Sequence, residues 1–354
     1  AAAAAAAAPT TRNIVVASLA CTSQPGEGSR WHSLTRRLLY ADLEDRFELA
    51  HCATELLVAQ ASMEESMLDP ATTGDRQLSP SVRRLAADCI SQVVDGEQMP
   101  QSIWFQAVVV LDAWLAARTP SVSDSSFLCE MSAACIAVLR VVCKTNVDTT
   151  HHRFRDWVGL AEMVCHMIQT FGHDPPAVSL HDLHVMEQSL LLDLQWQVNV
   201  PTVESWISML CGRFCVITND LYAKPLAQAA EKMHRLAQKL LWWKPADWQR
   251  RPQRLAAGLL GISLAGESLL HLEDLRLQHI HTQAWGQLFL DSQMIAVLPR
   301  CRLSPRYTQH VLTSLVGAAN LPLEEIKQDC EFTMRCLQGA AGALRRTGGL
   351  AFSF

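Results

Sequence analysis

Two stretches rich in small residues stand in matching places in the two halves of the chain, and they limit the possible folds more than any other feature. The first is SSFLCEMSAACIAVLRVVC, which contains Ser132, Ala133, Ala134 and Ala137, and the second is RPQRLAAGLLGISLAGESLL. Each stands third in its own series of helix-like segments. Small side chains let neighbouring helices approach closely, as at the centre of a bundle. The matching order indicates an internal duplication of a helical domain.

Helical periodicity continues through residues 81–346, with few strand signals. Pro80 and Pro100 precede the first two helices, as expected of a residue favoured at helix starts. The segment His184–Thr202, HVMEQSLLLDLQWQVNVPT, is predicted to be a helix that ends at Val200–Pro201, because the residue before a proline is pushed out of the helical region. The sequence therefore predicts an all-α protein.

The same pattern divides the chain into four parts. Residues 1–80 are predicted to be an N-terminal extension, partly disordered, with one helix around Leu34–Ala59. A first domain is expected over residues 81–200, a second over residues 201–345, and a tail over residues 346–354.

The composition favours a protein with a partner and without a membrane span. Hydrophobic residues make up 49% of the chain and charged ones 18%, below the ~25% usual for charged residues, so part of the surface is expected to be covered. A net charge of −5 gives no general case for nucleic acid. The 12 cysteines lack paired spacing and are expected to be reduced, which indicates an intracellular protein of the nucleus or cytoplasm. Apolar runs such as AVVVLDAWLAA fall short of the ~18 residues that a membrane span needs.

Enzymatic and metal sites are not expected. The chain has no phosphate-binding loop, dinucleotide-binding or nucleophile-elbow motif. Cys211 and Cys215 share a helical face and residues 279–281 read HIH, but the tight pairing of a structural zinc site is missing. The tryptophans of LLWWKPADW have too few cations around them for a nucleic-acid groove. We therefore expect no enzymatic activity, no cofactor, no metal and no small-molecule substrate.

In order along the chain, these segments resemble the cyclin family. SVRRLAADCI, AVVVLDAWLA and LCEMSAACIAVLRVV are similar to the first three helices of a cyclin box, and HVMEQSLLLDLQWQVNVPT is similar to its fifth helix. PQRLAAGLLGISLA and LEEIKQDCEFTMRCL resemble segments of a second box, so the likeness covers residues 81–345. It implies two tandem five-helix cyclin-like domains and a regulatory subunit that binds and positions a cyclin-dependent-type protein kinase.

The resemblance implies an ion pair between Arg83 and Asp112, on the first two helices of the first domain. Each of these charges lies within an apolar helical stretch, where a charge needs a partner. The alternative is that both side chains are separately solvated.

Glu187 falls on the glutamate through which family members contact a kinase. We expect it to be partly exposed beside apolar surface, although it could instead only complement the dipole of its own helix. The family's accompanying lysine is replaced by Leu139, and its next glutamates by Val141 and Val142. Arg140 is adjacent, but a one-residue step turns a side chain ~100° round a helix, so we expect it not to substitute unless the helix rotates.

These replacements lead to two further expectations. If the chain binds a kinase, Leu139, Val141 or Val142 should form an apolar patch next to Glu187. The docking groove for substrates is not expected, because Cys89 and Gln92 stand where the family has a tryptophan and an acidic residue. The alternative function is a cyclin-fold scaffold or adaptor subunit of a larger assembly that no longer binds a kinase.

Overall fold

The structure, a computed structural model, describes residues 58–62, 78–118, 123–146, 156–244, 251–279, 301 and 303–346. Within these ranges the regular elements are helices, with no strand, so the all-α prediction is confirmed. In chain order they are α3 (Pro80–Gly96), α4 (Gln101–Ala117), α5 (Asp124–Asn146), α6 (Trp157–Thr170), α7 (Leu180–Asp193), α8 (Val203–Ile217), α9 (Ala223–Trp243), α10 (Pro252–Gly266), the short 3₁₀ helix η2 (Glu273–Leu275), α12 (Pro305–Ala319) and α13 (Leu323–Arg346).

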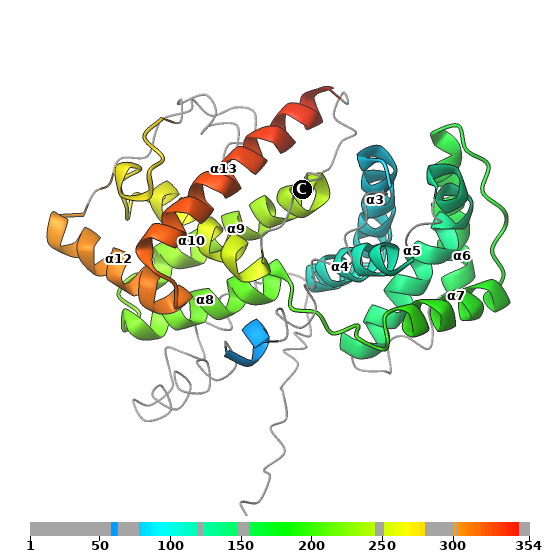
Figure 1. Cartoon of the computed structure of the whole chain (residues 1–354), viewed down its shortest axis with the longest axis horizontal. Coiled ribbons are helices and arrows are strands. Elements are labelled where there is room, and N and C mark those ends of the chain that lie inside the picture. Colours follow the sequence, from blue (N-terminus) through cyan, green and yellow to red (C-terminus); the bar gives the residue numbers. More distant parts are fainter. Residues whose placement is uncertain are drawn as a thin grey trace, which may run out of the picture.

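Helix α5 is the central helix of a first group of helices, α3 to α7. It contacts α3, α4, α6 and α7, and every residue from Met131 to Cys143 is buried. By length and composition alone, Asp124–Thr145 is apolar enough to cross a membrane, with a mean hydropathy of 1.8, but 83% of its most apolar window is buried inside the protein. The apolar character of α5 therefore matches its place among four neighbouring helices (Figure 1).

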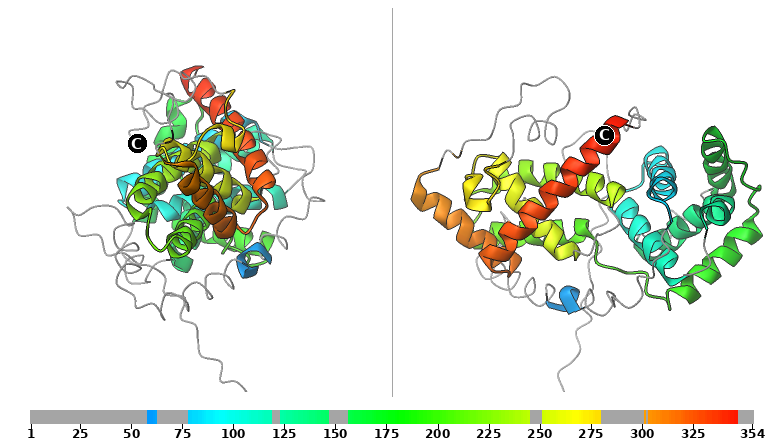
Figure 2. Two further views of the ribbon diagram at one scale, coloured as in Figure 1. Left: turned by 90° about the vertical axis from the view of Figure 1, so that its left-hand side faces the viewer. Right: turned by 45° about the horizontal axis from the view of Figure 1, so that its top comes forward.

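Helix α10 has the same role in a second group, which comprises α8, α9, α10, α12 and α13. It contacts each of the other four helices, and every residue from Leu255 to Ala265 is buried. A Cβ atom added at Gly258 would lie 2.7 Å from the carbonyl oxygen of Asp329, and one at Gly261 would lie 2.7 Å from Cys330 Sγ. The two glycines therefore permit the close approach of α13, which crosses the second group beside α9 and α10 (Figure 2).

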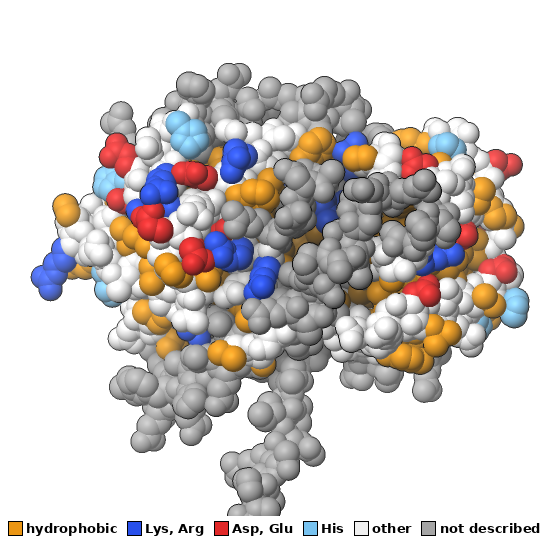
Figure 3. All heavy atoms as spheres, viewed as in Figure 1, with side chains coloured by type: hydrophobic (Ala, Val, Ile, Leu, Met, Phe, Trp, Pro, Cys, Tyr) orange, Lys and Arg blue, Asp and Glu red, His pale blue; other side chains and the backbone are white. Residues whose placement is uncertain are grey.

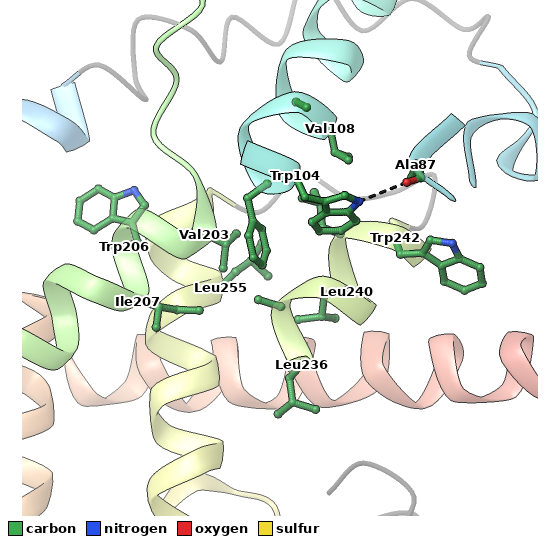
Figure 4. Close-up of a cluster of buried hydrophobic side chains, with 14 of the residues drawn as sticks. Ala87, Trp104, Val108, Val203, Trp206, Ile207, Leu236, Leu240, Trp242 and Leu255 are labelled. Atoms are coloured by element: carbon green, nitrogen blue, oxygen red, sulfur yellow. Dashed lines mark hydrogen bonds between the residues drawn. The ribbon is translucent and has the colours of Figure 1, made fainter. Parts of the chain in front are cut away.

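The two groups share a continuous core. Helix α3 contacts α9, and α4 contacts both α8 and α9. Trp104 of α4 donates a 3.2 Å hydrogen bond from its indole to the carbonyl of Ala87, and its ring lies near the end of α9 that carries Leu240 and Trp242 (Figure 4). Apolar packing therefore joins α3 and α4 to the second group.

Helix α7 ends earlier than the sequence analysis predicted. It ends at Asp193 rather than at Val200–Pro201. Gln195 and Trp196 adopt the left-handed conformation, with φ of 50° and 64°, and the backbone amide of Trp196 donates to the carbonyl of Leu191 at 2.8 Å. These hydrogen bonds satisfy the free carbonyls of the last helical turn. The helix therefore ends through its own C-terminal turn, and Pro201 is not what stops it.

Most of the predicted N-terminal helix around Leu34–Ala59 lies outside the described residues. The described residues 58–62 are helical, and Gln60 donates a 2.8 Å hydrogen bond to Ser205 at the start of α8. The described cysteines are free thiols, and all of them except Cys129 and Cys301 are buried, as expected of core residues. The tail over residues 346–354 lies outside the described residues, apart from the last residue of α13.

Candidate partner-binding site

Arg83 and Asp112 lie together where the two groups meet. Arg83 donates from Nε and Nη2 to the two carboxylate oxygens of Asp112, each at 2.8 Å, and both side chains are 12% exposed. At the end of α9, Arg83 Nη1 donates to the carbonyl of Trp242 at 3.0 Å, and Nη2 also donates to the carbonyl of Leu241 at 2.9 Å. Lys244 adds a further 2.8 Å bond to Asp112. The pair predicted within the first domain therefore also holds the last turn of a helix from the second group.

The environment of Asp112 favours its ionised form. Burial raises its pKa, but the charges and hydrogen bonds of Arg83 and Lys244 together outweigh burial and lower the pKa to about 2. The roles of Lys244 and of the α9 carbonyls were missed by sequence reasoning, because more than a hundred residues separate them from Asp112 and no local pattern connects them.

Glu187 is not partly exposed, as the sequence analysis expected. Only 5% of this residue is exposed, since α7 turns it inward against α5. Its carboxylate accepts two bonds from Lys144 Nζ, at 2.9 and 3.1 Å, and Arg140 Nε lies 3.1 Å from Oε1. Glu187 is therefore neutralised within the chain, by two cations of α5.

Arg140 lies within ion-pair distance of Glu187, a contact that was not predicted from the sequence. The geometry explains why: the carboxylate of Glu187 lies over the buried face of α5, where Arg140 is only 6% exposed. The contact is an ion pair, in which Arg140 Nε makes no hydrogen bond to the oxygen. Among the described residues, Arg140 Nε and Nη1 have no hydrogen-bond partner. Most buried polar atoms in proteins have a hydrogen-bond partner, so a buried guanidinium with unused donors is uncommon.

The predicted apolar patch does not exist on the surface of the chain. Leu139 and Val142 are fully buried and Val141 is 3% exposed. These residues belong to the stretch of α5 that is covered by its four neighbours. Where the family carries charges, this chain therefore has core side chains, which cannot form a partner surface without opening the fold.

Lys144 is the accessible member of this group of three charged residues, and it was not predicted from the sequence. Its side chain is 56% exposed, whereas the side chains of Arg140 and Glu187 are 7% and 6% exposed. The signal was present in the sequence: Lys144 follows Arg140 by four residues, which places both on one face of a helix. We call Arg140, Lys144 and Glu187 the α5–α7 cluster.

Helix α7 also carries exposed apolar side chains. Val185 and Leu192 are 51% and 68% exposed, and they lie two helical turns apart on one face. Glu187 is ~200° further round the helix than Val185, so the buried and exposed faces of α7 are distinct. Trp196, just after the helix, is 69% exposed. These residues lie on the outside of the first group, where they are open to a partner.

The remaining residues singled out in the sequence were the cysteine pair Cys211 and Cys215, the HIH stretch and the tryptophans of LLWWKPADW. Within the described ranges, no group of three or more His, Cys, Asp or Glu residues could hold a metal ion. Burial raises the pKa of the Cys211 and Cys215 thiols, in the latter to about 12, which disfavours thiolate ligands. Of the HIH stretch only His279 is described, and Trp248 also lies outside the described residues. In the second group, basic and acidic side chains are interspersed on the face in Figure 3.

A scan against protein-family models gives no match for the chain, and a search of curated proteins gives none either.

Proposed function

We propose that the chain is a cyclin-like regulatory subunit that binds and positions a protein kinase of the cyclin-dependent type. In this proposal the first group of helices is one cyclin-like five-helix domain and the second group is another. Support comes from the order of the helices: in each group a helix rich in small residues follows two others and packs at the centre. The chain itself would carry out no chemistry.

The α5–α7 cluster is the observation that carries this proposal. A lysine ammonium has three donors, and Glu187 accepts from Lys144 at 2.9 and 3.1 Å while the lysine side chain stays 56% exposed. Arg140 holds the carboxylate from its buried side. Glu187 thus orients Lys144, which can donate to a backbone carbonyl or carboxylate of a partner. In the proposal Lys144 makes the contact, and Glu187 acts through it.

The effect on the kinase would be positional. Docking of α5 and α7 on the mobile helix of the kinase would hold the catalytic lysine–glutamate pair and the activation loop in their active arrangement. Leu192 and Trp196 would add apolar area if the kinase also covers the outer face of α7, which is distinct from the face that carries Glu187, and aromatic residues are enriched at the centres of protein interfaces.

Copurification tests the proposal. The tagged chain, expressed in its native cells, should carry a protein kinase in near-equal amount by quantitative mass spectrometry. Lys144→Ala should remove the kinase. Lys232→Ala is the matched control, because Lys232 also pairs with a glutamate, Glu267, but lies in the second group; it should keep the kinase. A kinase that is bound equally by both variants contradicts the role of Lys144.

A scaffold function is the second candidate. It is favoured by the burial of Leu139, Val141 and Val142 and by the internal neutralisation of Glu187, which leave α5 without the charged rim that the family likeness implies. Under this alternative the chain copurifies with other subunits in fixed proportion, no kinase is present, and Lys144→Ala leaves the set of partners unchanged.

A further inference from the structure

A second carboxylate, Asp88, lies at the junction of the two groups. It belongs to α3, and Oδ1 accepts a 2.7 Å hydrogen bond from the indole Nε1 of Trp242, in the last turn of α9. Trp242 is buried, and Asp88 is partly buried beneath it. The bond joins residues 154 positions apart and connects the first group to the second.

Asp88 has no ion pair with any described residue, in contrast to Asp112 nearby. The closest cation along its own helix is Arg84, whose guanidinium lies over the rings of Trp242 and Trp243, at 5.6 and 5.1 Å from their centroids. Arg84 therefore makes cation–π contacts with both indoles, because the face of an aromatic ring attracts a cation. The junction leaves Asp88 with a neutral donor as its hydrogen-bond partner.

This environment raises the pKa of Asp88 from 3.8 to about 7. Burial is the largest cause, because it disfavours the charged form; the hydrogen bond from Trp242 and the charge of Arg84 act in the opposite direction but are weaker.

The other elements packed on α3 offer little charge to change this balance. Helices α5 and α6 present thiols, Cys135 and Cys165, to the neighbouring Cys89, and burial raises the pKa of Cys89 to about 12, so that this thiol stays neutral near neutral pH. On α4 and at the end of α9, Asp112 and Lys244 are bound to each other, and Arg83 shares Asp112 with Lys244.

We propose that the two groups of helices are coupled by a proton-sensitive junction, in which closure of α9 against α3 takes up a proton at Asp88 and opening releases it. Opening would place the carboxyl group in water and let it ionise without the penalty of burial. Asp112, with its two cations, holds the same turn of α9 at every pH near neutrality. The junction thus has two contacts with the end of α9: the ion pairs of Asp112, whose strength does not change near neutral pH, and the contact of Asp88 with Trp242, whose stability depends on the protonation of Asp88. The inference does not depend on the proposed function.

The sign of the effect follows from the raised pKa. Between the ordinary pKa of 3.8 and about 7, the folded chain keeps a proton that the unfolded or opened chain has released. The stabilisation is fully present below the ordinary value and is lost as the pH rises through about 7. Between about pH 5 and about pH 7 the contribution of Asp88 should therefore make unfolding easier as pH rises, by at most about tenfold in the equilibrium constant per pH unit for one proton, and from there to about pH 8.5 it should stay constant.

The test uses the full chain and Asp88→Asn, which keeps an oxygen for the Trp242 indole but cannot ionise. Relative to this variant, the unfolding equilibrium constant of the wild type should rise with pH up to about 7 and run parallel above it. Asp95→Asn, the same change at an exposed position further along α3, is the control and should follow the wild type. Parallel curves for the wild type and Asp88→Asn over the whole range would overturn the proposal.

Hydrogen exchange locates the effect. After correction for the intrinsic pH dependence of exchange, the backbone amides at the end of α9 should lose protection with rising pH in the wild type and not in Asp88→Asn. Equal loss in both chains overturns the proposal. Trp242→Phe gives a second route if Asp88→Asn does not fold. It removes the donor that lowers the pKa of Asp88, so the pH at which stability is lost should move upward; an unchanged midpoint would also overturn the inference.

Discussion

The junction between the two groups and the α5–α7 cluster are built from the same parts, a carboxylate between an arginine and a lysine, but they use them differently. At the junction, Arg83 donates to both oxygens of Asp112 and to two backbone carbonyls. In the α5–α7 cluster, Arg140 leaves Nε and Nη1 without a hydrogen-bond partner among the described residues. Complete pairing is typical of a structural contact. In the α5–α7 cluster the unused donors are buried, and Lys144 is the member that a partner can reach.

The largest expected effect is at the junction. Asp112→Asn removes the negative charge between Arg83 and Lys244 and strands a guanidinium that is only 12% exposed. Breaking one side of such a pair typically destabilises a protein by about 3–5 kcal/mol. Urea unfolding followed by circular dichroism at neutral pH measures the change. A loss below about 1 kcal/mol would show that Arg83 is held by the α9 carbonyls alone.

Glu187→Gln, the corresponding change in the α5–α7 cluster, should have a smaller effect. Only Arg140 is stranded by this change, because Lys144 is 56% exposed and returns to water, whereas Asp112→Asn affects both Arg83 and the less exposed Lys244. We expect a loss of about 1–3 kcal/mol in the same unfolding experiment. If the loss equals that of Asp112→Asn, the two regions are energetically alike and the distinction drawn between them is wrong.

Lys144→Ala should have the smallest effect on stability. Pairs in which one member is well exposed contribute about 0–1 kcal/mol, because solvent and salt screen them. The midpoint of urea unfolding should therefore change little, while the kinase is lost in the copurification described above. A large loss of stability together with loss of the partner would instead indicate that the variant misfolds, and the contact assigned to Lys144 would have to be withdrawn.

The sequence alone determined the helical class and the central place of two helices. Periodicity and proline positions mark where helices begin, and runs of Ala, Gly and Ser predict close packing because they leave room for a neighbouring backbone. The close approach of α13 at Gly258 and Gly261 follows from this rule. The pairing of Arg83 with Asp112 rested on family likeness and on the general need of a charge in an apolar stretch for a partner.

The tertiary structure decided which side chains are covered. From the sequence alone, an exposed apolar patch and a buried core were both compatible with Leu139, Val141 and Val142. The four helices around α5 cover these side chains and make them part of the core. The same packing turned Glu187 inward and left Lys144 exposed. The contacts of Trp242 with Asp88 and of Lys244 with Asp112 join residues more than a hundred positions apart. A local pattern fixes the face of a helix on which a residue lies, but burial, charge pairing and a shifted pKa depend on what the rest of the chain places against that face.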